Sequence, residues 1–331
     1  MKERYKELDL MKGIGIILVY LGHSFNFPNF KWTKIFLFLG STTYSFHMPL
    51  FFFISGLLSN TNKKIILEKF YKGKIKRLLI PYLFINFIDF IPRTLFPKLV
   101  NSEFGGIKEV LFYGTKISWF VYTLFIIFII FPILEKYIFK KDRYYLFGLF
   151  LIILNYLKIF KNIEIFSLNK VVIYLLYFYL GYIIKPFYKE KIKNGIGSQN
   201  LIFFIIGIVF LSLSYKYYYI NYFSSILFAI LGILFVLNLS LRIKVDTNIY
   251  KFLTFLGINS LTFYLIEGFI TVVYRVILLR IIPIEKSYLL VSVFFILRVL
   301  TAYIIVKLII VKSSILSFLL GASVEKKIIK V

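Results

Sequence analysis

The feature that most constrains this chain is a succession of long apolar segments, separated by short polar loops, along its 331 residues. Hydrophobic residues make up 60% of the chain, whereas a soluble domain averages about 45–50%. A membrane-spanning α-helix needs about 20 apolar residues, and most of the segments approach that length. Backbone groups must be satisfied inside lipid, and the segments lack the alternating pattern of outer-membrane strands. We therefore expect them to be helices.

The expected fold is an all-α, polytopic integral membrane protein with about ten transmembrane helices in one transmembrane domain over residues 1–331. The predicted spans are residues 10–28, 35–59, 78–97, 117–138, 144–160, 169–185, 200–215, 222–241, 252–277 and 287–311. Lysine and arginine are roughly twice as numerous in one alternating set of loops, which includes both chain ends, as in the other. The positive-inside rule then places both termini in the cytoplasm, which agrees with an even number of spans.

Composition also excludes several classes of function. The net charge of +26 does not indicate a nucleic-acid partner, because the lysines lie between apolar runs, as in cytoplasmic loops of membrane proteins. The chain has no cysteine, which excludes disulfides, a thiolate nucleophile and cysteine-ligated metals. With only two histidines, we expect neither a metal site nor a bound cofactor. No small-residue cleavage site follows the first apolar run, so a cleavable signal peptide is not predicted.

Both histidines lie deep in the first two spans. A titratable residue inside a span costs about 2.5–3.5 kcal/mol on insertion scales, so each one is a functional candidate. His23 follows Lys12 by eleven residues, which is about 16 Å along a helix and on the same face. If Lys12 extends to the inner interface, His23 lies near mid-bilayer, and His47 lies at a similar depth in the second span, beside Pro49. A lone intramembrane histidine is more often a helix contact than a catalyst, but two at equal depth favour a site.

Other charged residues lie within predicted spans. These are Asp89, Glu267 and Arg298. Glu267 is placed in the outer half of the ninth span and Arg298 near the middle of the last, so a buried ion pair between them is either structural or functional. Trp119, at the outer start of the fourth span, is expected to be an interfacial anchor. The basic run at 63–77 is expected to set the topology and contact lipid.

Several motifs resemble the acyltransferase 3 family of integral membrane acyltransferases, and in particular its fucose 4-O-acetylase-like branch. The motifs are DLMKGI (9–14), LGHS (21–24), FHMPLFFFISG (46–56), KRLLIPY (76–82), WF (119–120) and LGINSL (256–261). The resemblance covers nearly the whole chain. It implies about ten transmembrane helices and transfer of an acyl group, usually acetyl from acetyl-CoA, to a hydroxyl of a cell-surface or lipid-linked sugar. It also implies a multi-pass protein of the cell (cytoplasmic or inner) membrane.

The resemblance assigns roles to individual residues. His23 matches the essential histidine of the family. Lys12 stands where many members have an arginine, and lysine occupies that place in the fucose-acetylase-like branch, although it lacks the bidentate fork of arginine. Glu267 departs from the family pattern, in which the residue at that position is often histidine.

The expected reaction is attack of a sugar hydroxyl on the thioester carbonyl of acyl-CoA. A hydroxyl needs a base, and imidazole changes its charge near neutral pH, so His23 is assigned as the base. His47 is expected to hold substrate or to polarise the carbonyl. Lys12 and Arg77 are expected to bind CoA phosphates, with Asp9 orienting Lys12 from one turn away. The predicted substrate-binding or acyl-CoA-binding residues are Asp9, Lys12, Arg77, Trp119, Glu267 and Arg298.

Two other classes of function are compatible with the composition. A transporter or flippase of a glycan or small solute would also carry charged residues inside its spans. Such proteins often have inverted repeats and paired broken helices, and neither is evident in this sequence. A non-catalytic scaffold would leave the two deep histidines without a role. Consumption of an acyl-CoA thioester separates an enzyme from both alternatives.

Overall fold

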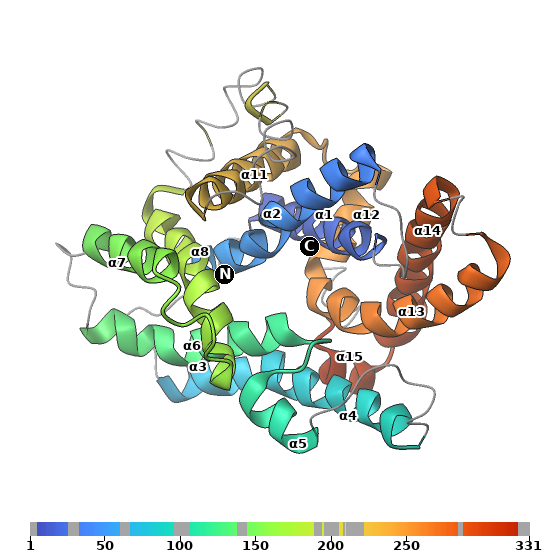
Figure 1. Cartoon of the computed structure of the whole chain (residues 1–331), viewed down its shortest axis with the longest axis horizontal. Coiled ribbons are helices and arrows are strands. Elements are labelled where there is room, and N and C mark those ends of the chain that lie inside the picture. The colour runs from blue at the N-terminus through green and yellow to red at the C-terminus, as the bar shows by residue number, and fades with distance from the viewer. Residues whose placement is uncertain are drawn as a thin grey trace. The chain divides into compact units, whose positions relative to one another are not determined.

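The computed structural model describes residues 5–25, 33–59, 67–95, 106–137, 144–188, 194, 205–207, 209, 222–283 and 287–323. Throughout these residues the regular elements are helices, and no strand occurs among them (Figure 1). Six of the described helices are long and apolar enough to cross a membrane: Lys34–Leu57, Trp119–Lys136, Ile165–Phe187, Ser225–Arg242, Ser260–Ile281 and Ser287–Ile310. The predicted all-α class is confirmed for these residues. The predicted span at 200–215 lies almost entirely outside them.

The chain divides into two compact units. Unit 1 consists of Met1–Ile54 and Ile184–Ile309, and unit 2 consists of Ser55–Ile183 and Ile310–Val331. Unit 1 contains α1 (Lys6–His23), most of α2 (Lys34–Leu57), α11 (Tyr222–Arg242), α12 (Asn248–Ile258), α13 (Ser260–Ile281), α14 (Ser287–Ile305) and most of η6 (Val306–Ile310). Unit 2 contains α3 (Leu67–Lys74), η1 (Ile75–Leu79), α4 (Ile80–Leu95), α5 (Gly106–Lys108), η3 (Glu109–Tyr113), α6 (Trp119–Tyr137), α7 (Tyr144–Tyr156), η4 (Ile165–Ser167), most of α8 (Leu168–Phe187) and α15 (Ser314–Leu320).

In unit 1, α1 and α12 approach each other so closely that backbone meets backbone. A Cβ atom on Gly13 would collide with the Leu253 carbonyl group of α12. A Cβ atom on Gly257 would collide in the same way with the Asp9 carbonyl group of α1. Small residues at such crossings are typical of helices packed within membranes. The two glycines therefore allow α1 and α12 to pack in backbone contact.

The predicted ninth span, 252–277, is two helices and not one, because the chain breaks at Asn259. The fully buried Asn259 side chain donates a hydrogen bond to the Phe255 carbonyl oxygen at 3.1 Å. Asparagine competes in this way with the backbone bonds of a helix, and its φ of −102° and ψ of 21° end α12. The longer helix, α13, starts at Ser260. Glu267 consequently lies in the first half of α13, and not in the second half of one helix over 252–277.

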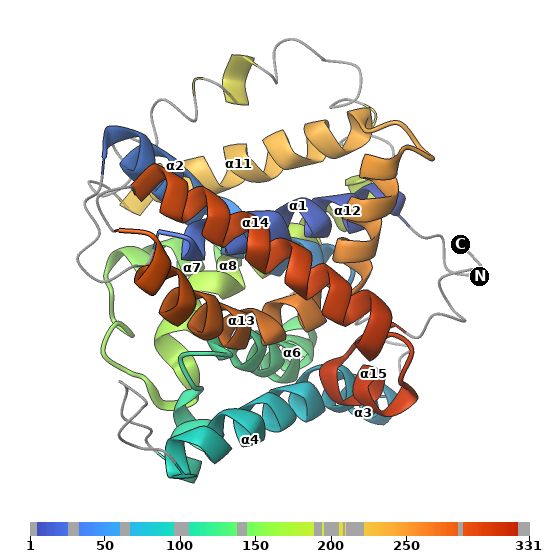
Figure 2. The same cartoon turned by 90° about the vertical axis from the view of Figure 1, so that its right-hand side faces the viewer.

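Helix α14, which lies beside α13 (Figure 2), buries one charged side chain and has an apolar outer face. Its buried residues include Leu290, Phe294 and Arg298, which recur every four residues along one face. The other face is apolar and about half exposed, at Leu289, Ile296, Leu300 and Ile304. A soluble helix carries its charged residues on the exposed face, whereas the exposed face of α14 is apolar and its arginine is buried. The arrangement of α14 suits a helix that is surrounded by lipid.

Unit 2 begins with a basic helical segment. Helices α3, η1 and α4 follow one another without a break from Leu67 to Leu95, so the predicted span at 78–97 continues a helix that starts outside it. The cations of this segment include Lys72 and Arg77, and both side chains are exposed.

Candidate active site

The end of α1 is buried and is held by side chains from other helices. Helix α1 ends at His23, inside the predicted first span of 10–28, and residues 26–28 of that span lie outside the described residues. A helix leaves its last carbonyl groups without backbone partners, so a buried helix end needs other donors. The carbonyl oxygen of Tyr20 accepts hydrogen bonds from the Ser24 hydroxyl at 2.7 Å and from the guanidinium of Arg298. Arg298 also donates to the Ser24 hydroxyl at 2.8 Å, so this side chain caps the helix end that carries His23.

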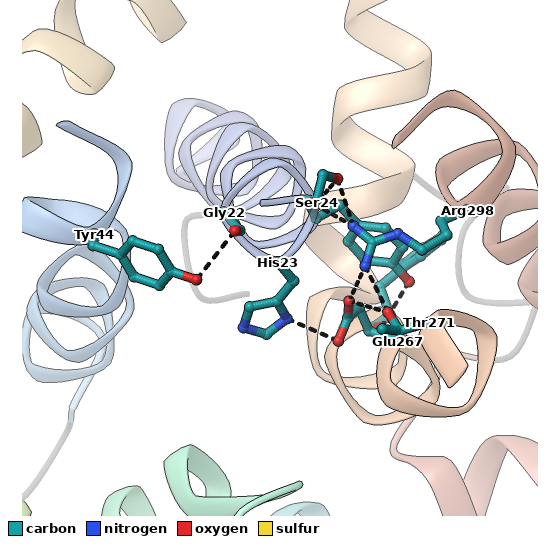
Figure 3. Close-up of polar contacts among 9 residues, drawn as sticks. Gly22, His23, Ser24, Tyr44, Glu267, Thr271 and Arg298 are labelled. Atoms are coloured by element: carbon teal, nitrogen blue, oxygen red, sulfur yellow. Dashed lines mark hydrogen bonds and ion pairs between the residues drawn. The ribbon is translucent and has the colours of Figure 1, made fainter. Parts of the chain in front are cut away.

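The carboxylate of Glu267, on α13, joins His23 to Arg298. Its Oε2 atom accepts a hydrogen bond from Nδ1 of His23 at 2.9 Å (Figure 3). Its Oε1 atom is 2.6 Å from Nη1 of Arg298. The side chains of Glu267 and Arg298 are 6% and 0% exposed, so this is a buried ion pair whose charges are also hydrogen-bonded. We call these three residues the His–Glu–Arg cluster.

Within the cluster, His23 is the residue that remains accessible. A carboxylate only accepts hydrogen bonds, so Nδ1 of His23 carries a proton, and Nε2 of the neutral ring has a free lone pair. The His23 side chain is 34% exposed, and its other ring nitrogen points away from Glu267 (Figure 3). If Nε2 takes a proton, the carboxylate and the C-terminal end of the α1 dipole both stabilise the resulting positive charge. The arrangement is that of a base oriented by a carboxylate.

His47 has a different environment. It is 4% exposed, and its Nδ1 atom donates to the Thr43 carbonyl oxygen at 2.7 Å, one turn earlier on α2. Its ring meets the Tyr44 ring edge-on, with 5.3 Å between ring centroids. The Tyr44 hydroxyl in turn donates to the Gly22 carbonyl oxygen at 3.1 Å, directly before His23 (Figure 3). The two histidines that the sequence placed at equal depth are thus linked through Tyr44.

The other predicted site residues lie outside the cluster. Lys12 is on the first half of α1, with its amino group 3.5 Å from the Asp9 carboxylate. Arg77, on η1, and Trp119, at the start of α6, belong to unit 2. The Trp119 ring packs 5.3 Å from the ring of Tyr174.

Sequence reasoning missed three hydroxyl groups around the cluster, on Tyr20, Ser24 and Thr271. The Thr271 hydroxyl is 2.6 Å both from Oε1 of Glu267 and from Nη1 of Arg298. It was predictable, because residues four apart on a helix share one face and Thr271 follows Glu267 by four. The Tyr20 hydroxyl donates to the Phe263 carbonyl oxygen at 3.0 Å, which joins α1 to α13 and has no signal in the sequence. Among the described residues, no group of three or more histidine, aspartate or glutamate side chains is arranged to hold a metal ion.

These features define a multi-pass helical membrane protein with an accessible histidine that is oriented by a buried glutamate–arginine pair. The chain matches the acyltransferase 3 family, described as an acyltransferase domain, over residues 5–307, and it belongs to that family. It is also similar to the nodulation protein NolL of Mesorhizobium japonicum, with 33% identity over 138 residues, which are 39% of this chain and 35% of that protein. The match thus spans about a third of that relative's length. No solved structure matches the chain.

Proposed function

We propose that this protein is a membrane O-acyltransferase that moves an acyl group, acetyl in the first instance, from acyl-CoA to a hydroxyl of a cell-surface or lipid-linked sugar. We place it in the cell (cytoplasmic or inner) membrane. The observation that carries the proposal is the 2.9 Å hydrogen bond from His23 to Glu267, with the second ring nitrogen open. Such a pair can take a proton from a hydroxyl. Membership of the acyltransferase 3 family supports the acyl chemistry. Acetyl-CoA is a substrate in this scheme, and no resident cofactor is needed.

The proposed reaction has two proton transfers at Nε2 of His23. The acceptor oxygen attacks the thioester carbonyl carbon while its proton passes to Nε2. A carbon–oxygen bond forms, the carbon–sulfur bond breaks, and the proton returns from His23 to the departing CoA sulfur, which leaves as a thiol. Glu267 stays ionised throughout, keeps the ring in the required tautomer and stabilises the imidazolium.

Arg298 acts in this proposal as a positioning residue. The sequence suggested that it binds substrate, but its side chain is 0% exposed, and its terminal nitrogens already bond α1, Thr271 and Glu267. Its charge keeps Glu267 ionised inside the protein, and its bond to Tyr20 sets the end of α1. Arg298 therefore fixes both members of the base pair and does not need to contact a ligand.

Lys12 and Arg77 keep their proposed role of binding CoA phosphates. Lys12 precedes His23 by eleven residues on α1, which is about 16 Å of helical rise. A CoA thioester carries its phosphates far from the reacting carbonyl, so a cation in the first half of α1 suits a donor that lies along this helix. His47 is proposed to assist through Tyr44, with which its ring is in contact.

The test is release of CoA from acetyl-CoA by the purified protein in the presence of a sugar acceptor. Because the chain has no cysteine, a thiol reagent reports only the CoA thiol. The His23→Gln variant keeps a polar side chain but has no base, so the rate is expected to fall by about 10²–10⁴-fold. Lys116→Gln, an exposed change in unit 2, is the control and should keep the wild-type rate.

The outcomes separate the base assignment from the reaction. If His23→Gln accumulates in the membrane, melts normally and releases CoA at the wild-type rate, the base is another group. If the wild-type protein consumes no thioester with any acyl-CoA and acceptor, acyl transfer is wrong and the transporter alternative gains support. Mass spectrometry of the surface polysaccharide, with and without the protein, then identifies the ester that is formed.

A further inference from the structure

Arg275 is a second arginine on α13 that the proposed reaction does not use. It follows Glu267 by eight residues, so it lies two turns further along and near the same face of the helix. It is partly buried, and its Nε atom is inaccessible to solvent. Within the described part of the chain, the guanidinium has neither a hydrogen-bond partner nor an ion-pair partner.

Among the residues that the structure describes, the charges around Glu267 do not balance. Arg298 already neutralises the Glu267 carboxylate through their 2.6 Å contact. Arg275 adds a second positive charge that lies close enough to interact electrostatically with both of these residues. His23 contributes no negative charge in either protonation state. Because a cation inside a membrane span is costly without a counter-ion, the region beside the cluster favours an anion.

The place of Arg275 on α13 argues against a simple interfacial anchor. Side chains on a helix generally lean toward its N-terminal end, which for Arg275 is the side of Thr271 and Glu267. If both termini are cytoplasmic, as we predict, α13 runs outward, and an anchoring arginine would instead extend outward to the headgroups. An anion bound at Arg275 therefore lies between the His–Glu–Arg cluster and the outer end of α13. The donor is proposed to approach from the first half of α1, at Lys12.

We propose that Arg275 binds an oxyanion, either a phosphate or a carboxylate, that is carried by the sugar whose hydroxyl reacts at His23. The planar guanidinium matches both groups through two parallel hydrogen bonds. The eight residues from Glu267 to Arg275 correspond to about 12 Å of helical rise. The lean of helical side chains toward the N-terminal end brings the guanidinium nearer to the cluster, to a distance that suits a monosaccharide with a charged substituent. This inference rests on the proposed transfer to a sugar. It narrows the acceptor to a sugar phosphate, a sugar linked to a lipid phosphate, or an acidic sugar.

The experiment is a binding measurement that needs no catalysis. Glucose 1-phosphate, glucuronate and glucose are titrated into purified protein in a neutral detergent, and the midpoint of thermal unfolding is followed. At least one of the two charged sugars should raise the midpoint of the wild type, whereas glucose should not. Arg275→Gln should weaken that response at least about tenfold in apparent Kd, and Arg275→Lys should keep part of it. Arg280→Gln, an exposed change on the same helix, should respond as the wild type does.

Three results overturn the proposal: no response of the wild type to either charged sugar, equal responses of the wild type and Arg275→Gln, or an Arg275-dependent response only to added phosphatidylglycerol. The last result would make Arg275 a headgroup contact. Because the titration contains no acyl-CoA, it can fail while thioester consumption succeeds, and the reverse also holds. In the transfer assay, Arg275→Gln should raise KM for a charged sugar about tenfold and leave KM for acyl-CoA unchanged, which a purely structural role would not do.

Discussion

Two buried polar clusters, one in each unit, show what separates a reactive site from a structural network. In unit 2, the Asn86 side chain donates to the Ser118 hydroxyl at 2.9 Å and accepts from the Thr115 hydroxyl at 2.5 Å. These three residues are 2%, 0% and 3% exposed, respectively. The His–Glu–Arg cluster in unit 1 is also held by hydrogen bonds, but Nε of Arg298 has no partner among the described residues and the His23 side chain is 34% exposed.

The two clusters differ in whether a polar group remains free to react. The neutral groups of the unit 2 network bond one another, and the network ties the segment before α6 to α4. The cluster in unit 1 is charged and keeps one titratable nitrogen with a free lone pair beside accessible space. Buried polar networks stiffen a structure when they are complete. An open titratable group adds chemistry, so changes in the His–Glu–Arg cluster should lower the rate, whatever they do to stability, and changes in the unit 2 network should act on stability alone.

The largest effect is expected from Glu267→Gln, which keeps the size of the side chain but removes its charge. Glutamine cannot stabilise the imidazolium, and its amide can impose the wrong tautomer on His23, so CoA release should fall by about 10²–10⁴-fold. Glutamine still offers an oxygen to Arg298 but leaves that cation without a counter-ion, so the variant should also lose stability, and its rate is measured per folded molecule. Glu267→Asp, which restores the charge, should recover part of the rate. A wild-type rate for Glu267→Gln would leave the carboxylate with a structural role only.

The next effect is on stability and comes from Arg298→Met. Removing this cation leaves the Glu267 carboxylate buried without a counter-ion, which should lower the free energy of unfolding by about 3–5 kcal/mol. The double variant Glu267→Gln/Arg298→Met should regain most of that loss, because it leaves no uncompensated charge, and it should remain slow. Thermal unfolding of the two variants in detergent makes the measurement. Equal midpoints for the single and the double variant would show that the pair is not the source of the stability.

The helical fold and the pairing of Glu267 with Arg298 could be predicted from the sequence, because their signals are local. Apolar runs of span length require helices, and a charge inside a span requires a partner, so Glu267 and Arg298 were candidates for each other. The bond between His23 and Glu267 was not predictable. It joins residues 244 positions apart, and nothing in the hydropathy of either helix specifies which faces meet.

The division of the predicted ninth span has no signal in the hydropathy. The apolar run is continuous through 252–277, whereas α13, the helix that carries Glu267, starts eight residues later, at Ser260. The break is caused by one side chain, Asn259, which bonds back to its own helix. A polar residue that satisfies itself locally leaves the average hydropathy almost unchanged, so the two-helix arrangement appears only in the structure.

A smaller effect is expected in unit 2, from Asn86→Ala. The hydroxyls of Thr115 and Ser118 would lose a buried partner, and the free energy of unfolding should fall by about 1–3 kcal/mol. The rate of CoA release per folded molecule should not change, because this network is structural. Thermal unfolding and CoA release, measured on the same preparation, give both quantities. A large loss of rate with an unchanged melting midpoint would show that the unit 2 network takes part in the reaction and is not only structural.

The smallest effect is expected from Tyr44→Phe, which removes one hydrogen bond at the end of α1. The ring stays and can keep its contact with His47, and the Gly22 carbonyl oxygen still accepts from the Phe25 amide at 3.4 Å. Stability should fall by about 0.5–1.5 kcal/mol. Tyr122→Phe is the matched control in unit 2, because its hydroxyl donates to the Leu111 carbonyl oxygen at 2.7 Å. Both variants should lose similar stability. Only Tyr44→Phe should lower kcat, by a few fold, because Tyr44 bonds the end of α1 that carries His23 and Tyr122 does not. Equal kcat values would mean that Arg298 alone positions the base and that any contribution of His47 does not pass through Tyr44.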